Sequence, residues 1–271
     1  MDLIARLRRK KTQAVAVPLE GERIVVRPSR PSIPSVAICS LATGQHRKLL
    51  AESGPTLLEL GERLGWTVVL SCELLSTRPT SWSKLKLIES LLGEFEFVFW
   101  IDADAIVVDL SANILGDIGP DSDAWFVRHP QQRREDQSVL NAGVFLVRRS
   151  AFVADLLDAI WKQDDLIDHN WWENAALLRL LGFSLEPPYE RVADSPWMAR
   201  VSELDLRWNS VPEYCESPRP AINHHARADH GLFERRLKAM QADRIAVMGP
   251  ASTALPIRSA GDSTRLRKAT N

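Results

Sequence analysis

The segment that decides the fold reads FEFVFWIDADAIVV and covers residues 95–108. Its apolar, aromatic and β-branched run is typical of a strand buried inside a parallel sheet. The run ends in two carboxylates, Asp102 and Asp104, and such charges are almost never buried without a partner. In open α/β sheets, ligands bind at the edge where the carboxyl ends of the strands lie. Divalent cations bind carboxylate and phosphate oxygens together. The segment therefore favours a metal–nucleotide site, although the same spacing fits two aspartates that face solvent or cap the next element.

The composition of the chain limits the classes of function. Its 271 residues suffice for one large or two small domains, and the composition is that of an ordinary soluble globular protein. The 34 basic and 35 acidic side chains give a net charge of −1, which does not support a general nucleic-acid binder. The cysteines Cys39, Cys72 and Cys215 follow no metal or disulfide spacing, and free thiols suit a reducing compartment.

The two ends of the chain differ from its middle. No run is long and apolar enough to cross a bilayer, and there is no signal-peptide hydrophobic region, so a cytoplasmic location is expected. The basic residues 1–11 place Leu3, Ile4 and Leu7 at helical spacing. This start favours a solvated, partly disordered terminus, and it also fits peripheral contact with an anionic inner membrane face.

Strand and helix patterns alternate along the chain and predict an α/β fold. The order indicates a mostly parallel central sheet flanked by helices, with right-handed crossovers. Strands are expected at 36–42, 66–70, 95–101, 124–127 and 143–147, and helices at 49–64, 152–161, 173–181 and 231–242. A further helix is expected to start within Ser81–Lys84, with a serine as its cap, and to run to Gly93. The domain organisation expected is a tail and linker over 1–33, one domain over 34–245 and a disordered tail over 246–271.

A histidine pair, His224 and His225, follows a short apolar stretch far downstream of the two aspartates. Histidine is the commonest transition-metal ligand, and carboxylates with imidazole suit Mn²⁺ better than carboxylates alone suit Mg²⁺. Taken with Asp102 and Asp104, the pair completes a three-ligand site. Taken alone, it is more typical of a surface loop.

Two further polar motifs stand at the starts of expected elements. Asn141-Ala142-Gly143 precedes a strand, where glycine permits close approach by a ligand and asparagine can bond hydroxyls, or where the chain simply turns. Trp171-Trp172-Glu173-Asn174 precedes a helix. Its functional interpretation is an acid at a reaction centre with tryptophan under a sugar ring, and its structural one is a carboxylate that complements the helix dipole.

The order of these motifs resembles the family 34 glycosyltransferases, which are α-galactosyl-, α-mannosyl- and α-xylosyltransferases, and the related family 8 enzymes, which include glycogenin-type glucosyltransferases. The resemblance covers about residues 35–230 and rests on Ser81–Lys84, Phe99–Ala105, Asn141–Arg148, Glu173–Leu177, Arg207–Pro212 and Asn223–Ala226. It implies a GT-A fold, a Rossmann-like domain with nucleotide-binding and acceptor-binding halves. It also implies transfer of a hexose or pentose from a nucleotide sugar, favouring a UDP-sugar, to a glycan or other hydroxyl acceptor, with retention of anomeric configuration.

The resemblance also implies roles for single residues. Mn²⁺, or Mg²⁺ in its place, would be held by Asp102, Asp104 and His224. On the donor side, the expected contacts are Lys84 with the phosphates or sugar, Ala103 beside the metal, Asn141, Ala142 and Gly143 with the sugar, and Ser40, Ala42 and Thr43 with the base. Glu173 and Asn174 match an acidic–Gln pair near the anomeric carbon, Asn209 matches an asparagine near the acceptor, and Trp171 and Trp172 are further acceptor candidates.

Two departures from the family pattern keep an alternative open. Asn174 is one methylene shorter than the family's glutamine, and Arg227 replaces a glycine. Both fit a non-catalytic module that binds nucleotide sugars or glycans on the same fold. A third interpretation, a haloacid dehalogenase-type phosphatase, also has Asp-x-Asp after an apolar strand, but its motif continues differently from Ala105-Ile106. For a transferase, same-face attack assisted by Glu173 and Asn174 is favoured, with Glu173 as the nearest candidate for a nucleophile.

Overall fold

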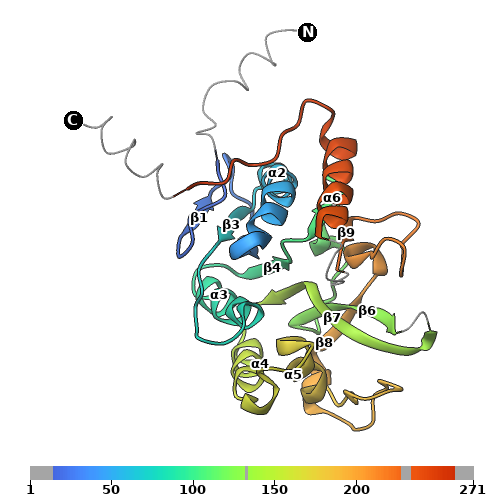
Figure 1. Ribbon diagram of the computed structural model, residues 1–271. Helices are drawn as coiled ribbons and strands as arrows, with labels where there is room; N and C mark the ends of the chain where they lie inside the picture. Colours follow the sequence, from blue (N-terminus) through green and yellow to red (C-terminus); the bar gives the residue numbers. More distant parts are fainter. Residues whose placement is uncertain (1–14, 132–133, 227–232, 260–271) are drawn as a thin grey trace.

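A seven-stranded sheet runs through the middle of the molecule in the computed structural model, which describes residues 15–131, 134–226 and 233–259 (Figure 1). In spatial order the strands are β1 (Arg23–Val26), β3 (Thr67–Ser71), β2 (Val36–Leu41), β4 (Phe97–Ile101), β7 (Arg134–Arg148), β6 (Ala124–Gln131) and β8 (Val201–Leu204). All point the same way except β1 and β7, which run antiparallel to their neighbours. The predicted α/β fold with a mostly parallel sheet is confirmed.

Helices cover both faces of this sheet. On one face lie α2 (Arg47–Leu64) and α6 (Phe233–Met248), and on the other lie α3 (Ser83–Leu92), α4 (Ala151–Trp161) and α5 (Trp172–Leu180) (Figure 1). Because successive side chains of a strand point to opposite faces, β4 feeds both apolar cores. Val98 and Trp100 pack on the α3 side, while Phe99 packs on the α2 side. This double burial explains why the strand sequence is almost continuously apolar.

The helix starts and ends follow local signals only in part. Helix α2 ends where predicted, and Gly65 after it has φ 75°, a left-handed conformation that glycine adopts without steric cost. Helix α3 begins at Ser83, but the hydroxyl of that residue accepts a hydrogen bond from the Leu75 backbone N–H at 3.1 Å. The expected serine cap is therefore absent, and Ser83 instead holds the preceding loop.

A second, two-stranded sheet was not predicted, because each of its strands is only three residues long. Strand β5 (Ala105–Val107) follows the Asp-x-Asp motif and pairs antiparallel with β9 (Ile222–His224). The register sets Ala105 opposite His224. This pairing joins the two segments in which sequence analysis placed the metal ligands.

Parts of both predicted tails belong to the packed structure. Strand β1 lies within residues 1–33 and pairs with β3. Past residue 245, Leu255 packs on the α2-side core and Ile257 forms a parallel bridge with Val17. These short pairings need no sequence periodicity, so they carried no signal. The domain limits of 34 and 245 stay a prediction; the basic residues 1–11, Arg227 and residues 260–271 lie outside the described residues.

Among the described residues, no helix combines the length and apolar character that crossing a membrane requires. The cysteines Cys39, Cys72 and Cys215 are all buried free thiols.

Candidate active site

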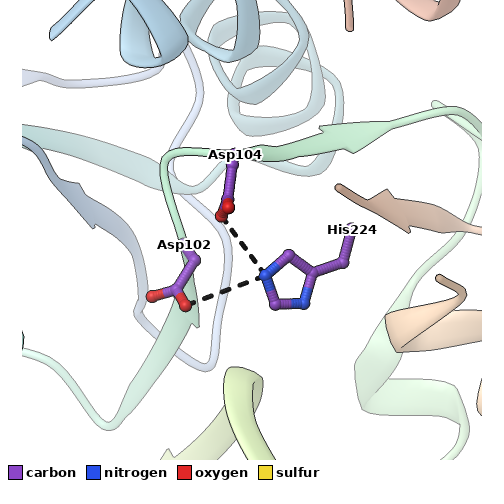
Figure 2. A group of neighbouring side chains, drawn as sticks. All are labelled: Asp102, Asp104 and His224. Carbon is purple, nitrogen blue, oxygen red and sulfur yellow. Dashed lines mark ion pairs between the residues drawn. The ribbon is translucent and has the colours of Figure 1, made fainter. Parts of the chain in front are cut away.

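Two segments far apart in the sequence bring three metal-ligating side chains together. Asp102 follows β4, Asp104 precedes β5, and His224 ends β9. The Nε2 atom of His224 lies 3.2 Å from Oδ1 of Asp104 and 3.9 Å from Oδ2 of Asp102. Figure 2 shows both carboxylates and the imidazole pointing toward one another. One ligand atom from each residue lies within 4.8 Å of the other two, an arrangement that could hold a metal ion.

The surroundings of His224 fit a bound divalent cation. Two carboxylates and an imidazole are a donor set for Mn²⁺ and related ions. The imidazole ring lies directly against Gly143, where a Cβ atom would come within 2.1 Å of the His224 Cε1. Only glycine leaves room for the ring in this position. The His224 Nδ1 is 2.8 Å from the side-chain oxygen of Asn209, so its Nε2 is the atom left to face the carboxylates.

A cation of the protein itself lies beside this centre. The Arg236 guanidinium on α6 is 3.1 Å from Oδ2 of Asp104. Burial raises the pKa of Asp104, but His224 and Arg236 outweigh burial and hold the pKa at about 2. Burial likewise opposes the charged form of His224, and the Asp104 carboxylate reverses the effect, so the pKa of His224 is raised. Arg236 was not predicted to belong to the site, because nothing in its local sequence marks it.

Lys84 lies next to Asp102, and its ammonium is surrounded by acceptors of the protein. Its ammonium contacts Glu173 Oε1 at 2.7 Å, the Ala142 carbonyl at 2.9 Å and Asp102 Oδ1 at 3.3 Å. Burial lowers the pKa of Lys84, but the Asp102 and Glu173 carboxylates outweigh it and the net shift is upward. A lysine ammonium has three N–H donors, and all three have acceptors here. The predicted contact of Lys84 with the donor phosphates or sugar stays a prediction.

Glu173 is buried at the start of α5. Its side chain is 6% exposed, and burial raises its pKa even though Lys84 acts in the opposite direction. The residue is thus the counter-charge of Lys84 and does not present an open carboxylate. Next to it, Asn174 Oδ1 accepts a hydrogen bond from the Ala142 backbone N–H at 2.8 Å.

Asn141, Ala142 and Gly143 lie inside strand β7, where its pairing with β6 shifts in register between Phe126 and Val127. The prediction that this motif precedes a strand is therefore wrong, and we call the segment the Asn141–Gly143 bulge. Besides the contacts of Ala142 with Lys84 and Asn174, the Gly143 carbonyl accepts a hydrogen bond from the Asp102 N–H at 2.8 Å. The role of this motif in lining a ligand stays a prediction.

Two tryptophans, Trp171 and Trp172, lie at the start of α5. The Trp171 ring lies 5.1 Å from the Tyr189 ring between centroids. Trp172 is 45% exposed and has φ 45°, a left-handed conformation that is rare for a bulky residue. Trp172 is therefore available to a ligand, while Trp171 is partly buried against the core.

Most of the other predicted site residues are buried. Ser40 and Ala42 at the end of β2 are buried, whereas Thr43 is partly exposed and its hydroxyl contacts that of Thr80 at 3.2 Å. Ala103 is also buried. Asn209 is completely buried behind His224, and its place near an acceptor stays a prediction.

His225 points away from the metal group, with its Nε2 3.0 Å from Oδ2 of Asp243. That contact lies next to a hollow of about 640 Å³ whose lining includes Asp109, Asn223 and Asp243. Because neighbouring residues of β9 point to opposite sides, this hollow is separate from the His224 centre.

No protein-family model and no curated protein matches this chain. Among solved structures, a glycosyltransferase involved in glycosylation of the major capsid of PBCV-1 aligns with a TM-score of 0.56 and 14% identity, over 77% of this chain and 100% of that one.

Two further glycosyltransferases align over similar lengths. The galactosyltransferase LgtC, in complex with donor and acceptor sugar analogues, gives a TM-score of 0.51 and 13% identity over 76% of this chain and 95% of its own. GlyE of Streptococcus pneumoniae TIGR4 gives 0.52 and 13%, over 78% and 60%. At such identities the likeness shows the fold, which is that of GT-A glycosyltransferases, and the resemblance to family 34 in particular stays a prediction.

Proposed function

We propose that this protein is a metal-dependent, retaining glycosyltransferase that moves a hexose or pentose from a nucleotide sugar, a UDP-sugar by preference, to a glycan or other hydroxyl acceptor. The observation that carries the proposal is the convergence of Asp102, Asp104 and His224 on a GT-A fold. The phosphatase interpretation shares only the Asp-x-Asp spacing, and the solved structures named above are glycosyltransferases.

Departure of a nucleoside diphosphate places new negative charge on its terminal phosphate. A divalent cation held by Asp102, Asp104 and His224 supplies Lewis acidity for that charge. The chain's own contribution is to keep these ligands in place. Lys84 holds the Asp102 carboxylate from below, and Trp100 Nε1 donates to the same Oδ1 atom at 2.7 Å.

Burial of Glu173 supports same-face attack over a covalent intermediate. A nucleophile must reach the anomeric carbon, but Glu173 is 5% exposed and ion-paired with Lys84 at 2.7 Å. In same-face attack the bond between the anomeric carbon and the phosphate oxygen breaks while the acceptor oxygen bonds to that carbon. The acceptor proton passes to the departing phosphate oxygen. In this mechanism Glu173 holds Lys84 in place against the Asn141–Gly143 bulge, and Asn174 borders the sugar.

The exposed ring of Trp172 supports an acceptor site at the start of α5. Aromatic faces pack on the apolar faces of sugar rings, and Trp172 stands two residues from Asn174. Its left-handed backbone is a strain that the surrounding structure maintains, as is common at functional sites. A glycan acceptor stacked on Trp172 would lie next to the proposed reaction centre.

The test is a thermal-shift panel of UDP- and GDP-sugars with and without Mn²⁺, followed by donor hydrolysis without an acceptor. A ligand that binds the native state raises the melting temperature. We expect a Mn²⁺-dependent shift with one donor and slow hydrolysis of that donor, both lost in Asp104→Asn. The matched control, Asp121→Asn, removes an exposed aspartate outside the site and should leave both unchanged.

Binding without hydrolysis would favour the non-catalytic module. The absence of any shift, or full activity in Asp104→Asn, would contradict the proposed metal-dependent transferase.

A further inference from the structure

A chain of hydrogen bonds joins His224 to the Asn141–Gly143 bulge of β7. The His224 Nδ1 lies 2.8 Å from Oδ1 of Asn209, and Asn209 Nδ2 donates to Oδ1 of Asn141 at 2.9 Å. The same Asn141 oxygen accepts a hydrogen bond from the Gly143 backbone N–H at 2.8 Å. Asn209 and His224 are both buried, at 0% and 3% exposure, so water does not compete for these bonds.

The direction of every bond in this line follows from one backbone donor. The Gly143 N–H can only donate, so the Asn141 atom that faces it must be the amide oxygen. That oxygen accepts again from Asn209, which must therefore present its NH₂ group to Asn141. The Asn209 oxygen is then left facing His224. Because an amide oxygen only accepts, the His224 Nδ1 must carry a hydrogen, and in the neutral ring the lone pair stands on Nε2, toward the carboxylates.

The backbone of Asn209 is held as firmly as its side chain. The ring of His129 donates from Nε2 to the Asn209 carbonyl at 2.6 Å. The neighbouring Ser210 carbonyl accepts from the His224 backbone N–H at 2.7 Å. Asn209 is thus anchored to β9, which carries His224, to β6, and to the Asn141–Gly143 bulge of β7.

We infer that Asn209 is a positioning residue that fixes the tautomer and ring orientation of His224 and links this ring to the Asn141–Gly143 bulge. Partners of metal-bound histidines typically change metal affinity 10–100-fold when removed. The part of the inference that concerns metal binding stands on geometry alone. The effect of Asn209 on donor binding rests on the proposed function, in which the Asn141–Gly143 bulge lines the donor sugar site. Metal binding and donor binding are then coupled through Asn209.

Two substitutions separate the two bonds of Asn209. Asn209→Leu removes both, whereas Asn209→Asp keeps an acceptor for the His224 Nδ1–H but places a carboxylate against the Asn141 oxygen. For Mn²⁺ alone, measured by electron paramagnetic resonance, we expect Asn209→Leu to lose 10–100-fold in affinity and Asn209→Asp to stay within about threefold of the wild type. Donor affinity at saturating Mn²⁺ should fall in both variants.

The control is Asn223→Leu, the same exchange on the opposite side of β9, where the side chain bonds to Asp243 at 2.9 Å. It should leave the Mn²⁺ affinity unchanged. A merely structural role for Asn209 would weaken metal affinity equally in the Leu and Asp variants, and that result would overturn the inference.

A spectroscopic test applies to the folded wild type and to Asn209→Asp, even if Asn209→Leu does not fold. Side-chain ¹⁵N spectra of the metal-free protein, at a pH where the ring is neutral, identify the His224 tautomer, with signals assigned by their loss in His224→Gln. The Nδ1–H form is expected in both proteins, and the Nε2–H form would overturn the inference. Neither the Mn²⁺ titration nor the tautomer spectrum needs a nucleotide sugar, so failure of the donor panel alone would count against the proposed function and leave the positioning role intact.

Discussion

Replacement of Gly143 by alanine should remove metal binding while the protein stays folded. An added Cβ would lie 2.1 Å from Cε1 and 2.8 Å from Nδ1 of His224, and ordinary contact begins at 3.4 Å. The ring, or the strand, must therefore shift by about 1.3 Å if ring and methyl group are to coexist. Metal–ligand distances tolerate deviations of only about 0.2 Å. Overpacking of this kind costs about 1–3 kcal/mol of folding stability, which a domain of this size survives.

The assay is direct binding of Mn²⁺ to Gly143→Ala, by electron paramagnetic resonance or calorimetry, with the melting temperature as the measure of folding. We expect a loss of about 100-fold or more in affinity, comparable with loss of a ligand's support. Gly116→Ala is the matched control, because a Cβ there meets no atom within 4 Å and the backbone φ is not positive. Wild-type Mn²⁺ affinity in Gly143→Ala would refute the reasoning, since it would mean that the His224 ring does not need its observed position.

Three further outcomes follow from the site and its surroundings. Arg236→Gln removes a cation that competes for Asp104, so Mn²⁺ alone should bind about fivefold more tightly, the equivalent of roughly 1 kcal/mol; weaker binding in calorimetry would show instead that Arg236 supports the carboxylate. Burial lowers the pKa of His129 from 6.5 to about 4, so its contribution to stability is complete above pH 6.5 and is lost as the pH falls toward 4. This amounts to about 3 kcal/mol, and urea unfolding of His129→Gln should show a correspondingly flatter dependence over that range. Trp172→Ala should reduce acceptor-dependent transfer about tenfold and leave donor hydrolysis unchanged, because the exposed ring lies on the acceptor side; equal loss of both rates in kinetic assays would contradict the acceptor assignment.

The parts of the fold that the sequence predicted are those with a local signal. Strand β4 carries an unbroken apolar run, and α2 carries helical periodicity that stops at Gly65. The Asp-x-Asp motif at the strand end marks two of the three metal ligands in the same local way. His224 was connected to it by the ligand chemistry of imidazole and by the order of motifs in the families it resembles, because the three-residue strands β5 and β9 are too short to show periodicity.

The partners of the site residues could not be predicted, because they depend on contacts between distant segments. Asn209 matches an asparagine near the acceptor by resemblance, and the structure adds that its side chain is buried against His224 and Asn141. Lys84 was predicted to contact the donor phosphates or sugar, and the structure adds three protein acceptors around its ammonium. These contacts join segments that are far apart in the sequence, so no local pattern could show them.

The charges around the centre argue that the metal and the donor diphosphate bind as a unit. The site holds three carboxylates, those of Asp102, Asp104 and Glu173, and two permanent cations, Lys84 and Arg236, all within one connected set of contacts. With His224 neutral as a ligand, the set carries one net negative charge, and a dication converts it to one net positive charge. A partly buried net positive charge is costly without a counter-ion, and a diphosphate supplies one. Mn²⁺ affinity should therefore rise about tenfold or more in the presence of UDP and fall less steeply with salt than surface pairs do. Calorimetric titration with and without UDP measures the coupling, and identical Mn²⁺ affinities in the two titrations would show that the charges of the site are balanced independently of the nucleotide.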